Sequence, residues 1–249
     1  MTPSIGVSII MTPHNRTNLL MTTLDSIWAQ NYPDLEIIVV EDRPSENSLG
    51  AFCARNKIKY AARKTPLEGW VNPAPLLNHG LLMATKDIII FQNAECKHEK
   101  LDTIQSLVLP IVEAEQKHYP PLSTSACVQS LNRDGSFEQW LVHPTDGARA
   151  GWISYFCQAV SRASAMKVQG FEEEFKQYGY EDDMFEFMLR ESGVRLSTIL
   201  GTLVSHQWHP KFTGDQKNSG EGIYKRICCQ VKVGERPPVA NYKKPWGNL

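Results

Sequence analysis

The sequence lacks the features that mark several classes of protein. Its 26 lysines and arginines are balanced by 27 aspartates and glutamates, so the formal net charge is -1 at pH 7. Without excess positive charge there is no global field that drives nonspecific nucleic-acid binding, which leaves only a local basic groove for that role. No stretch approaches the roughly 20 apolar residues of a membrane-spanning helix, and residues 1–11 hold no basic leader before a long apolar segment. We therefore expect a cytoplasmic protein without its own membrane anchor.

The six cysteines form no recognisable pattern. They are scattered without a repeated Cys-x-x-Cys spacing, which argues against a disulfide framework or a zinc ribbon. Cys96 and His98 would make half of a metal site, but no second pair of ligands accompanies them. We therefore expect reduced thiols.

Strands and amphipathic helices alternate in the first half of the chain. Apolar runs rich in β-branched residues predict strands at residues 7–11, 35–40 and 87–91. Apolar residues at helical spacing predict helices around residues 20–28, 77–84 and 101–112, the last kinked or broken at Pro110. Strand, helix and strand in this order indicate a parallel sheet flanked by helices.

The second half is less regular. We expect a strand at residues 124–129, a hairpin turn at Asp134-Gly135, a return strand at residues 140–142, and a helix around residues 184–189 closed by Gly193. From Pro210 onward the chain is polar, so loops are expected there. No linker divides the 249 residues, 42% of which are hydrophobic, and one domain is expected.

Polar side chains follow each of the three predicted parallel strands. They are Thr12 and Asn15, Glu41 and Asp42, and Asn93 and Glu95. Ligands of open α/β sheets bind outside the carboxyl ends of the strands, so these side chains are expected to converge on one cleft. The cleft has several acids and no glycine-rich phosphate loop, since residues 12–15 contain no glycine. Such a site suits a divalent cation that bridges carboxylates to a diphosphate.

Three ordered segments of the first half carry a resemblance to a known family. They are VSIIMTPHNR at residues 7–16, SIWAQNYPD at residues 26–34 and EIIVVED at residues 36–42. They resemble family 2 glycosyltransferases of the GT-A fold, and the similarity extends more loosely to about Pro210. The resemblance implies an α/β fold in a single GT-A-like domain, residues 1–249, with a central, mainly parallel sheet flanked by helices and a smaller mixed acceptor-side region. Residues 1–120 would bind the nucleotide sugar, residues 121–210 would form the acceptor and catalytic half, and residues 211–249 a loop-rich tail.

The resemblance also implies donor-binding roles. Thr12 and Asp42 match residues that hold the nucleoside of the donor, with Asp42 accepting a hydrogen bond from the base. Asn93-Ala94-Glu95 falls where the family carries its DxD metal motif; Asn93 replaces the first acid, which leaves Glu95 as the metal ligand and Asn93 as a neutral contact to ribose or phosphate. Further donor-binding candidates are Pro13, Asn15, Glu41, Asn78 and, as a lid, Trp208.

Three motifs of the second half extend the resemblance. GFEEEF at residues 170–175 and GYEDD at residues 179–183 resemble the Gly-Phe-acid turn and the ED motif of the family, which implies Asp182 as general base beside Glu181. VSHQWH at residues 204–209 resembles the segment that supplies a metal-binding histidine in polypeptide N-acetylgalactosaminyltransferases, with His206 as the first choice and His209 as the second. Imidazole, carboxylate and diphosphate ligands suit manganese better than calcium.

Each of these residues has a structural alternative. The three acids at residues 181–183 could simply favour a helix N-terminus, Glu41 and Asp42 could be turn acids, and the two histidines could be hydrogen-bonded structural residues. Trp208 could pack in the core. Three other aromatic residues could either line the acceptor groove or be buried: Trp70, Trp152 and Tyr155.

The sequence therefore predicts a metal-dependent, inverting glycosyltransferase that uses a nucleotide-sugar donor, expected to be a UDP-sugar, with Mn²⁺ or Mg²⁺. The expected acceptor is a glycan; a hydroxylated DNA base or a protein is the alternative. A rival hypothesis, motivated by Asn93, is a catalytically silent module that binds sugar nucleotides or glycans. A nucleotidyltransferase that makes sugar nucleotides is disfavoured because its glycine-rich phosphate loop is missing.

Overall fold

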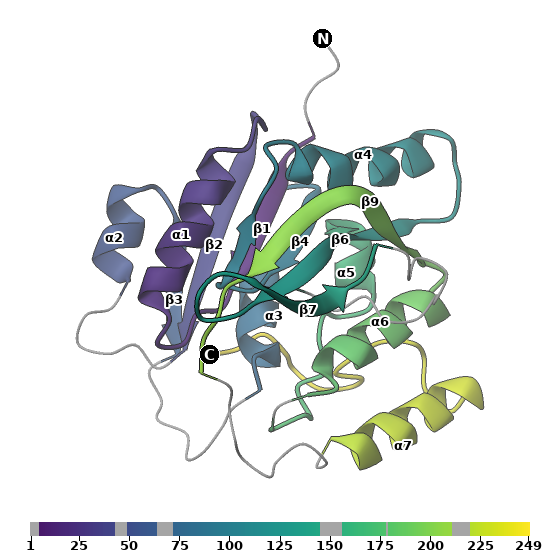
Figure 1. The fold of residues 1–249 in the computed structure, drawn as a ribbon. Helices are drawn as coiled ribbons and strands as arrows, with labels where there is room; N and C mark the ends of the chain where they lie inside the picture. The colour runs from purple at the N-terminus through teal and green to yellow at the C-terminus, as the bar shows by residue number, and fades with distance from the viewer. Residues whose placement is uncertain (1–4, 43–48, 64–71, 145–155, 178, 211–219) are drawn as a thin grey trace.

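The computed structural model describes residues 5–42, 49–63, 72–144, 156–177, 179–210 and 220–249. Their backbone forms a nine-stranded sheet with helices on both faces (Figure 1). The strands are β1 (Val7–Met11), β2 (Leu35–Asp42), β3 (Lys59–Arg63), β4 (Ile88–Gln92), β5 (Cys96–His98), β6 (Leu122–Leu131), β7 (Phe137–Val142), β8 (Cys157–Ser161) and β9 (Arg195–His206). The helices are α1 (Thr17–Trp28), α2 (Gly50–Arg55), α3 (Ala74–Met83), α4 (Thr103–Gln116), α5 (Arg162–Lys167), α6 (Glu181–Glu191) and α7 (Glu221–Lys232).

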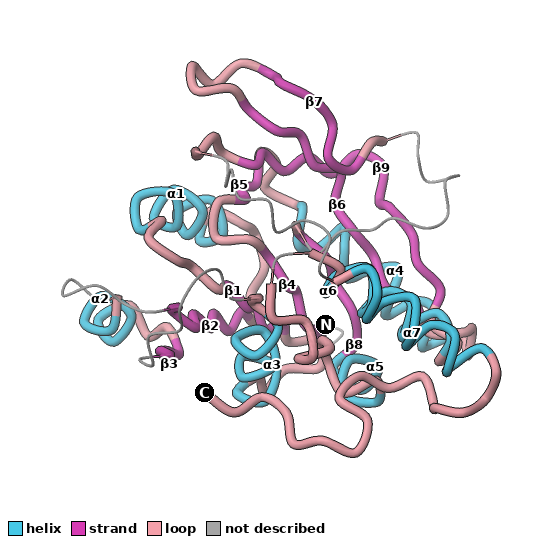
Figure 2. Tube along the Cα trace, turned by 90° about the horizontal axis from the view of Figure 1, so that it is seen from below, coloured by secondary structure: helices cyan, strands magenta, loops and turns pink. Residues whose placement is uncertain are grey.

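The N-terminal half of the sheet is parallel, in the order β3-β2-β1-β4. Every residue of β1 and β4 is buried, because helices cover both faces of these short β-branched strands. The three strands predicted in this half are confirmed, and β2 continues beyond the predicted end to Asp42. The carboxyl ends of β2, β1 and β4 therefore lie next to one another at the edge that Figure 2 views from below.

The second half of the sheet is mixed. β8 pairs antiparallel with β4 and with β6, and β9 runs parallel to β6. β5 and β7 are added antiparallel, to β9 and β6 respectively. The strands β1, β2, β3, β4, β6 and β9 share one direction, which confirms a mainly parallel sheet. The hairpin turn at Asp134-Gly135 is also confirmed, with Gly135 at φ +84°.

Alternate residues of the central strands serve two separate hydrophobic clusters. Ile9 of β1 packs with the apolar faces of α1 and α4 on one side of the sheet. Ile10 packs with α3, α5 and α6 on the other side. Among the described residues, no helix combines the length and the apolarity that crossing a bilayer requires.

The structure corrects two expectations. Helix α7 lies in the region expected to be loops, and it forms because its apolar stripe, including the fully buried Ile227, packs on the α6 side of the core. Pro110 does not break α4, since packing of Ile104, Leu107 and Ile111 against the sheet offsets the helix-breaking cost of a proline, about 3 kcal/mol. The short elements α2, β3, β5, β8 and α5, and the long strand β9, were not predicted.

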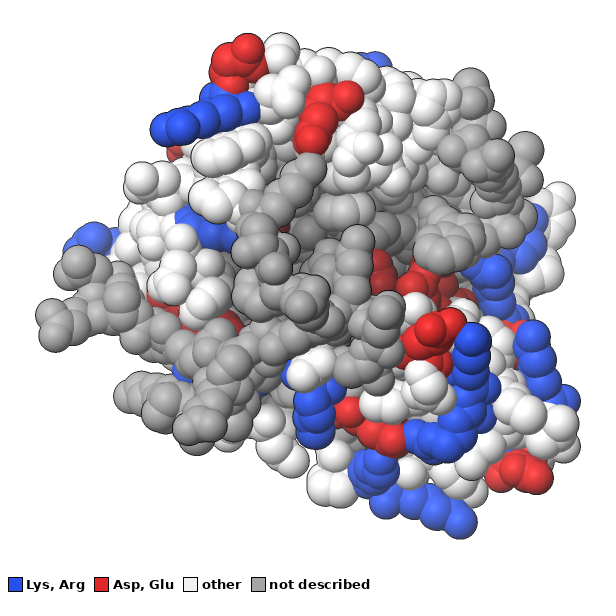
Figure 3. Space-filling model, turned by 60° about the horizontal axis from the view of Figure 1, so that its bottom comes forward, with Lys and Arg blue, Asp and Glu red and all other residues white. Residues whose placement is uncertain are grey.

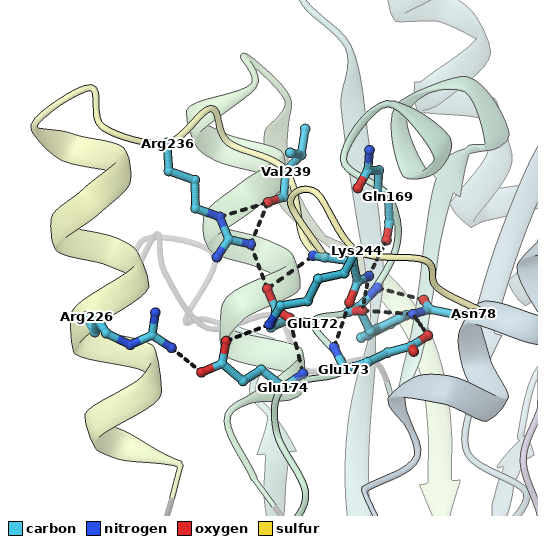
Figure 4. A network of polar contacts seen from close by, with 11 residues as sticks. Asn78, Gln169, Glu172, Glu173, Glu174, Arg226, Arg236, Val239 and Lys244 are labelled. Carbon is cyan, nitrogen blue, oxygen red and sulfur yellow. Dashed lines mark hydrogen bonds and ion pairs between the residues drawn. The ribbon is translucent and has the colours of Figure 1, made fainter. Parts of the chain in front are cut away.

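The described C-terminal tail, residues 220–249, is held by a buried ion pair (Figure 4). Arg236 Nη2 donates to Glu172 Oε2 at 2.6 Å, and the backbone N–H of Asn241 donates to the same oxygen at 3.1 Å. The side chains of Glu172 and Arg236 are 1% and 9% exposed. The first acid of the GFEEEF motif is therefore a structural anchor.

The other two acids of this motif also bind the tail (Figure 4). Glu173 Oε1 accepts hydrogen bonds from Gly247 N at 2.7 Å and from Asn78 Nδ2 at 2.8 Å. Glu174 forms exposed ion pairs with Arg226 and Lys244. The whole motif thus fastens the tail to α3, through Asn78.

We predict that Arg236→Met destabilises the protein by about 3 kcal/mol, because it leaves Glu172 buried without its cation. The matched control, Arg226→Met, removes an exposed pair and is expected to cost less than about 1 kcal/mol. Chemical denaturation of the two variants measures both values. Equal losses in the two variants would contradict the anchoring role of Glu172.

Candidate active site

The loop after β1, residues 12–16, ties together the carboxyl ends of three strands. Asp42 N donates to the Pro13 carbonyl at 3.0 Å, and His14 Nδ1 lies 3.0 Å from the Asp42 carbonyl oxygen. Arg16 then pairs with Glu95, which follows β4. The polar residues after β1, β2 and β4 therefore meet at one edge, as the order β2-β1-β4 requires.

A cleft of about 640 Å³ opens at this edge. It is lined by His14, Asn15, Arg16, Thr17, Asn18, Leu19, Glu41, Trp208, His209 and Pro210. The start of α1 and the segment after β9 thus share one cleft, although they lie near opposite ends of the chain. Figure 3 turns this edge toward the viewer and shows acidic side chains exposed on that face.

Glu95, His206 and His209 form the single group of possible metal ligands found among the described residues. Glu95 Oε1 lies 3.4 Å from His206 Nε2 and 3.5 Å from His209 Nε2. The three ligand atoms lie within 4.8 Å of one another, a spacing that suits ligands around one ion at bond lengths of about 2 Å. The structure thus brings together the three residues that the sequence singled out as metal ligands.

The pairing of β5 with β9 builds this cluster. Cys96, which follows Glu95, lies opposite His206 in the antiparallel register. Between the two histidines, Gln207 N donates to the Glu95 carbonyl at 2.9 Å, and Gln207 Nε2 donates to Leu19 O at 3.1 Å on α1. Gln207 therefore fixes the backbone from which both histidines project.

The Glu95 side chain stays charged although it is buried. Only 4% of the residue is exposed, and burial alone would raise its pKa. Hydrogen bonds from His206 and His209, with the positive charge of Arg16, outweigh burial and hold the pKa of Glu95 well below its ordinary value. At neutral pH the side chain is therefore a carboxylate that can bind a cation.

The donor set fits a divalent transition metal. His209 Nδ1 lies 3.0 Å from the Pro210 carbonyl oxygen, to which it can donate. In that neutral tautomer Nε2 has a lone pair for a cation, which would then replace the hydrogen bond from Nε2 to Glu95. This Nε2 is the atom that faces Glu95. Two imidazoles and one carboxylate suit manganese better than calcium, which prefers an all-oxygen shell.

Glu41 and Asp42 lie at the end of β2 and have protein partners. Asp42 Oδ1 accepts hydrogen bonds from Arg63 Nε at 2.9 Å and Nη2 at 2.8 Å. Glu41 Oε2 accepts from Leu49 N at 3.0 Å and Tyr60 Oη at 2.7 Å, and Glu41 also lines the cleft. These contacts fix the orientation of both carboxylates beside the loop after β1.

The remaining donor-binding candidates lie at the carboxyl edge of the sheet or at the cleft. Thr12 and Asn93 are half-buried at the carboxyl edge, Pro13 is buried there, and Asn15 is exposed at the cleft. Trp208 is 38% exposed and lies under the Arg133 guanidinium at 5.4 Å, so it does not belong to the core. Trp70, Trp152 and Tyr155 lie outside the described residues.

Asn78 does not lie at the cleft. It is fully buried, and its Nδ2 donates to Phe171 O and Glu173 Oε1, both at 2.8 Å. Its Oδ1 accepts from Phe171 N at 2.8 Å. With both ends of its amide bound, Asn78 supports the GFEEEF turn in place of the expected donor contact.

Three acids begin α6, and they differ in environment. Glu181 is 2% exposed and its Oε2 accepts from Asn72 Nδ2 at 2.8 Å. Burial and the neighbouring Asp182 raise the pKa of Glu181 to about 8, and the same two causes raise that of Asp183 to about 6. Asp182 is half-buried, with Oδ1 accepting from Asp183 N at 2.9 Å.

The backbone before these acids is unusual. Gly179 and Tyr180 both adopt left-handed conformations, with φ of 98° and 70°. Such a conformation is uncommon for tyrosine and persists where surrounding structure imposes it, frequently at functional sites. Asp182 therefore follows directly on a backbone segment in an uncommon conformation.

Sequence reasoning missed four residues that organise the site: Arg16, Arg63, Asn72 and Gln207. Arg63 and Asn72 could not be found, because β3 was not predicted and Asn72 acts on a residue more than 100 positions away. Arg16 stood in a quoted motif, and Gln207 lay between two chosen histidines. For Arg16 and Gln207, the available signal was that each lies next to residues already predicted to belong to the site.

Part of the chain is similar in sequence to known glycosyltransferases. Residues 8–118 match the family model described as Glycosyl transferase family 2. The chain is 28% identical over 108 residues to the amylovoran biosynthesis glycosyltransferase AmsB of Erwinia amylovora. The aligned region covers 42% of this chain and 36% of AmsB.

Solved structures share the fold. S. aureus TarS 1-349 matches with a TM-score of 0.65 at 18% identity, over 90% of this chain and 64% of that one. GalNAc-T7, in its structure with UDP, GalNAc and Mn²⁺, matches with a TM-score of 0.67 at 13% identity, over 94% of this chain and 48% of that one. The chain thus spans about a third of the length of AmsB and somewhat less than two thirds of TarS 1-349.

The fold is therefore that of the GT-A proteins, as the sequence predicted. Residues 8–118 match the family 2 glycosyltransferases, and the chain is similar to a known glycosyltransferase over 108 residues.

We predict that His209→Ala weakens Mn²⁺ binding by at least about tenfold, because it removes one ligand of the Glu95 cluster. Isothermal titration of Mn²⁺ into the purified protein measures the change. His118→Ala, at an exposed position beyond α4, is the matched control and should bind like the wild type. Equal affinities in both variants would place the metal elsewhere.

The raised pKa of Glu181 predicts a pH-dependent stability. The folded protein retains this proton up to about pH 8, whereas the unfolded chain releases it near the ordinary value of 4.5. This contribution to stability therefore falls as the pH rises between these values. Glu181→Gln, which can still accept from Asn72, should raise the melting temperature over wild type more at pH 8 than at pH 5.

Thermal unfolding at the two pH values checks this expectation. Glu113→Gln, at an exposed position on α4, supplies the control. A gain from Glu181→Gln that is the same at pH 5 and pH 8 would show that Glu181 ionises normally in the folded protein.

Proposed function

We propose that the protein transfers a sugar from a nucleotide-sugar donor to an acceptor hydroxyl with the help of Mn²⁺ or Mg²⁺. The observation that carries this proposal is the Glu95, His206 and His209 cluster, which lies beside a cleft at the carboxyl edge of a family 2 domain. A low-pKa carboxylate and two imidazoles can hold a divalent cation where the diphosphate of a donor would enter. A cytoplasmic location stays an expectation from the sequence.

The proposed donor is a UDP-sugar. Structures of TarS 1-349 with UDP and with UDP-GlcNAc, and of GalNAc-T7 with UDP and Mn²⁺, support this choice. The mannosyltransferase PcManGT of Pyrobaculum calidifontis was solved with GDP-Man and Mn²⁺, so the fold alone does not select the base. The choice of nucleotide is therefore part of the test.

The donor would lie across the ends of β1, β2 and β4. Asp42, oriented by Arg63, is placed to accept a hydrogen bond from the base next to Thr12 and Pro13, and Asn93 would contact ribose or phosphate. A divalent cation bound by Glu95, His206 and His209 supplies positive charge that stabilises the departing diphosphate. Arg16, which already faces Glu95, can add a further positive charge to the same leaving group.

Asp182 is the proposed general base. It begins α6 on a backbone held in an uncommon conformation, and it is half-buried rather than enclosed. Its neighbour Glu181 keeps its proton at neutral pH, so it serves as a hydrogen-bonding support for Asn72 rather than as the base. Deprotonation of the acceptor by Asp182, with attack opposite the leaving diphosphate, would invert the anomeric carbon.

The proposed acceptor is a glycan. A protein side chain or a hydroxylated DNA base is the alternative, and the near-neutral charge of the chain favours the uncharged acceptors.

We predict that the wild type releases nucleotide from one or more donors in a panel of UDP-, GDP- and TDP-sugars, and that a chelator suppresses the release. In the same assay Asp182→Asn should lower acceptor-dependent transfer by at least about 100-fold, the scale of general-base catalysis. Its affinity for donor, measured by calorimetry, should stay within about twofold of wild type, since only the base is changed. Asp183→Asn is the matched control and should retain most of the transfer.

Two results would contradict the proposal. Unchanged turnover in Asp182→Asn would refute the base assignment. Donor binding without hydrolysis or transfer across many acceptors would instead support the silent binding module that Asn93 suggests.

A further inference from the structure

Two β-bulges in β7 place three aromatic side chains on one face of the β6–β7 hairpin. The register pairs Leu131 with Phe137, Ser130 with Gln139, Gln129 with Trp140, and Val128 with Val142. Glu138 and Leu141 are therefore extra residues on the β7 strand. In a regular strand, side chains three positions apart point to opposite faces. One extra residue between them shifts the alternation by one position, so that they point to the same face. Phe137, Trp140 and His143 consequently share a face.

Ring contacts confirm this alignment. The centroids of Phe137 and Trp140 lie 5.6 Å apart, and those of Trp140 and His143 also lie 5.6 Å apart. The bulge residue Leu141 and its neighbour Val142 both pack on the opposite side, against the α1 and α4 cluster. The three rings, which we call the β7 ring row, thus turn away from that cluster.

The β7 ring row is accessible and belongs to a projecting part of the molecule. Phe137 is 50% exposed, and Trp140 and His143 are half-buried. The hairpin extends beyond the rest of the sheet in Figure 2. A large apolar side chain at such a position contributes nothing to the core, which points to a ligand.

The hairpin is continuous with the candidate active site. Ser130 lies opposite the metal-ligand candidate His206 in the pairing of β6 with β9, and Gln129 Nε2 donates to Ser205 Oγ at 2.9 Å. At the turn, the Arg133 guanidinium covers the ring of Trp208, which lines the cleft. A molecule bound along the hairpin would therefore lead to the site of transfer.

The charge and backbone of the hairpin narrow the kind of ligand. Residues 122–144 carry Arg133 as their one lysine or arginine, against Asp134 and Glu138. This balance disfavours a polyanion such as DNA or an anionic membrane surface. The two bulges also interrupt the edge of β7, which disfavours addition of a peptide strand. A neutral ligand with apolar faces and hydroxyl groups suits this surface, and an oligosaccharide has both.

We propose that the β7 ring row is the carbohydrate-binding platform for the acceptor, with pyranose rings stacked on Trp140 and Phe137. The C–H faces of a sugar ring match the electron-rich faces of these aromatic rings, and His143 can hydrogen-bond a hydroxyl. The role of the platform as an acceptor site rests on the proposed glycosyltransferase function. The binding of glycan itself can be measured without any donor.

The test uses a glycan array of defined neutral oligosaccharides probed with the fluorescently labelled full chain. We expect the wild type to bind a subset of these glycans, and Trp140→Ala to raise the dissociation constant for them at least about tenfold. Trp140→Phe keeps an aromatic face and should restore most of the affinity, whereas Phe137→Ala should give an intermediate loss. Trp28→Ala, at an exposed tryptophan on α1, is the matched control and should bind as wild type does.

The outcomes separate the two proposals. Absence of glycan binding by the wild type, or equal binding by wild type and Trp140→Ala, overturns the platform. Binding that requires Trp140 but persists in a chain that fails to bind any nucleotide sugar supports the platform and contradicts the proposed function. An equal loss in Trp140→Ala and Trp140→Phe, with unchanged melting temperatures, also overturns stacking as the cause.

Discussion

A buried carboxylate that must stay charged organises the functional edge of this protein. An unpaired buried charge costs several kcal/mol, so Glu95 needs cationic or hydrogen-bonding partners at close range. The partners come from two distant segments: Arg16 from the loop after β1, and His206 and His209 from the end of β9. The strand order therefore does two things at once: it brings these distant segments together, and it supplies Glu95 with the partners that its charge needs. A divalent cation, like Arg16, would place positive charge beside the buried Glu95 carboxylate.

Three other buried acids among the described residues have two kinds of environment, which differ in how the acid is stabilised. Asp42 and Glu172 are each paired with an arginine, Arg63 and Arg236, and they orient a strand end and the C-terminal tail. Glu181 is bound by an amide, and burial beside another acid keeps its proton in place. The candidate base Asp182 thus stands next to a neutral support, on a helix start that the hydrogen bond between Asn72 and Glu181 helps to position.

Local patterns in the sequence were enough to predict three of the four strands in the parallel half of the sheet, because β1, β2 and β4 are short apolar runs covered on both faces. The resemblance to family 2 glycosyltransferases and to polypeptide N-acetylgalactosaminyltransferases, rather than local patterns, indicated Glu95, His206 and His209 as metal ligands. The sequence could not indicate that Asn78 is enclosed by the GFEEEF turn, because this depends on contacts between distant segments. The apolar stripe of α7 was a local signal for a helix in the tail, and the expectation of loops overlooked it. The bulges of β7 were equally hidden, since spacing by three residues in a strand normally predicts opposite faces.

The central claim is that Glu95, His206 and His209 hold one cation against the diphosphate of a nucleotide. Crystals grown with UDP and Mn²⁺, measured near the manganese absorption edge, test it most directly. We predict an anomalous peak within bonding distance of all three side chains and of the UDP phosphates. Ordered UDP with manganese bound elsewhere, or with no manganese beside Glu95, would contradict the account.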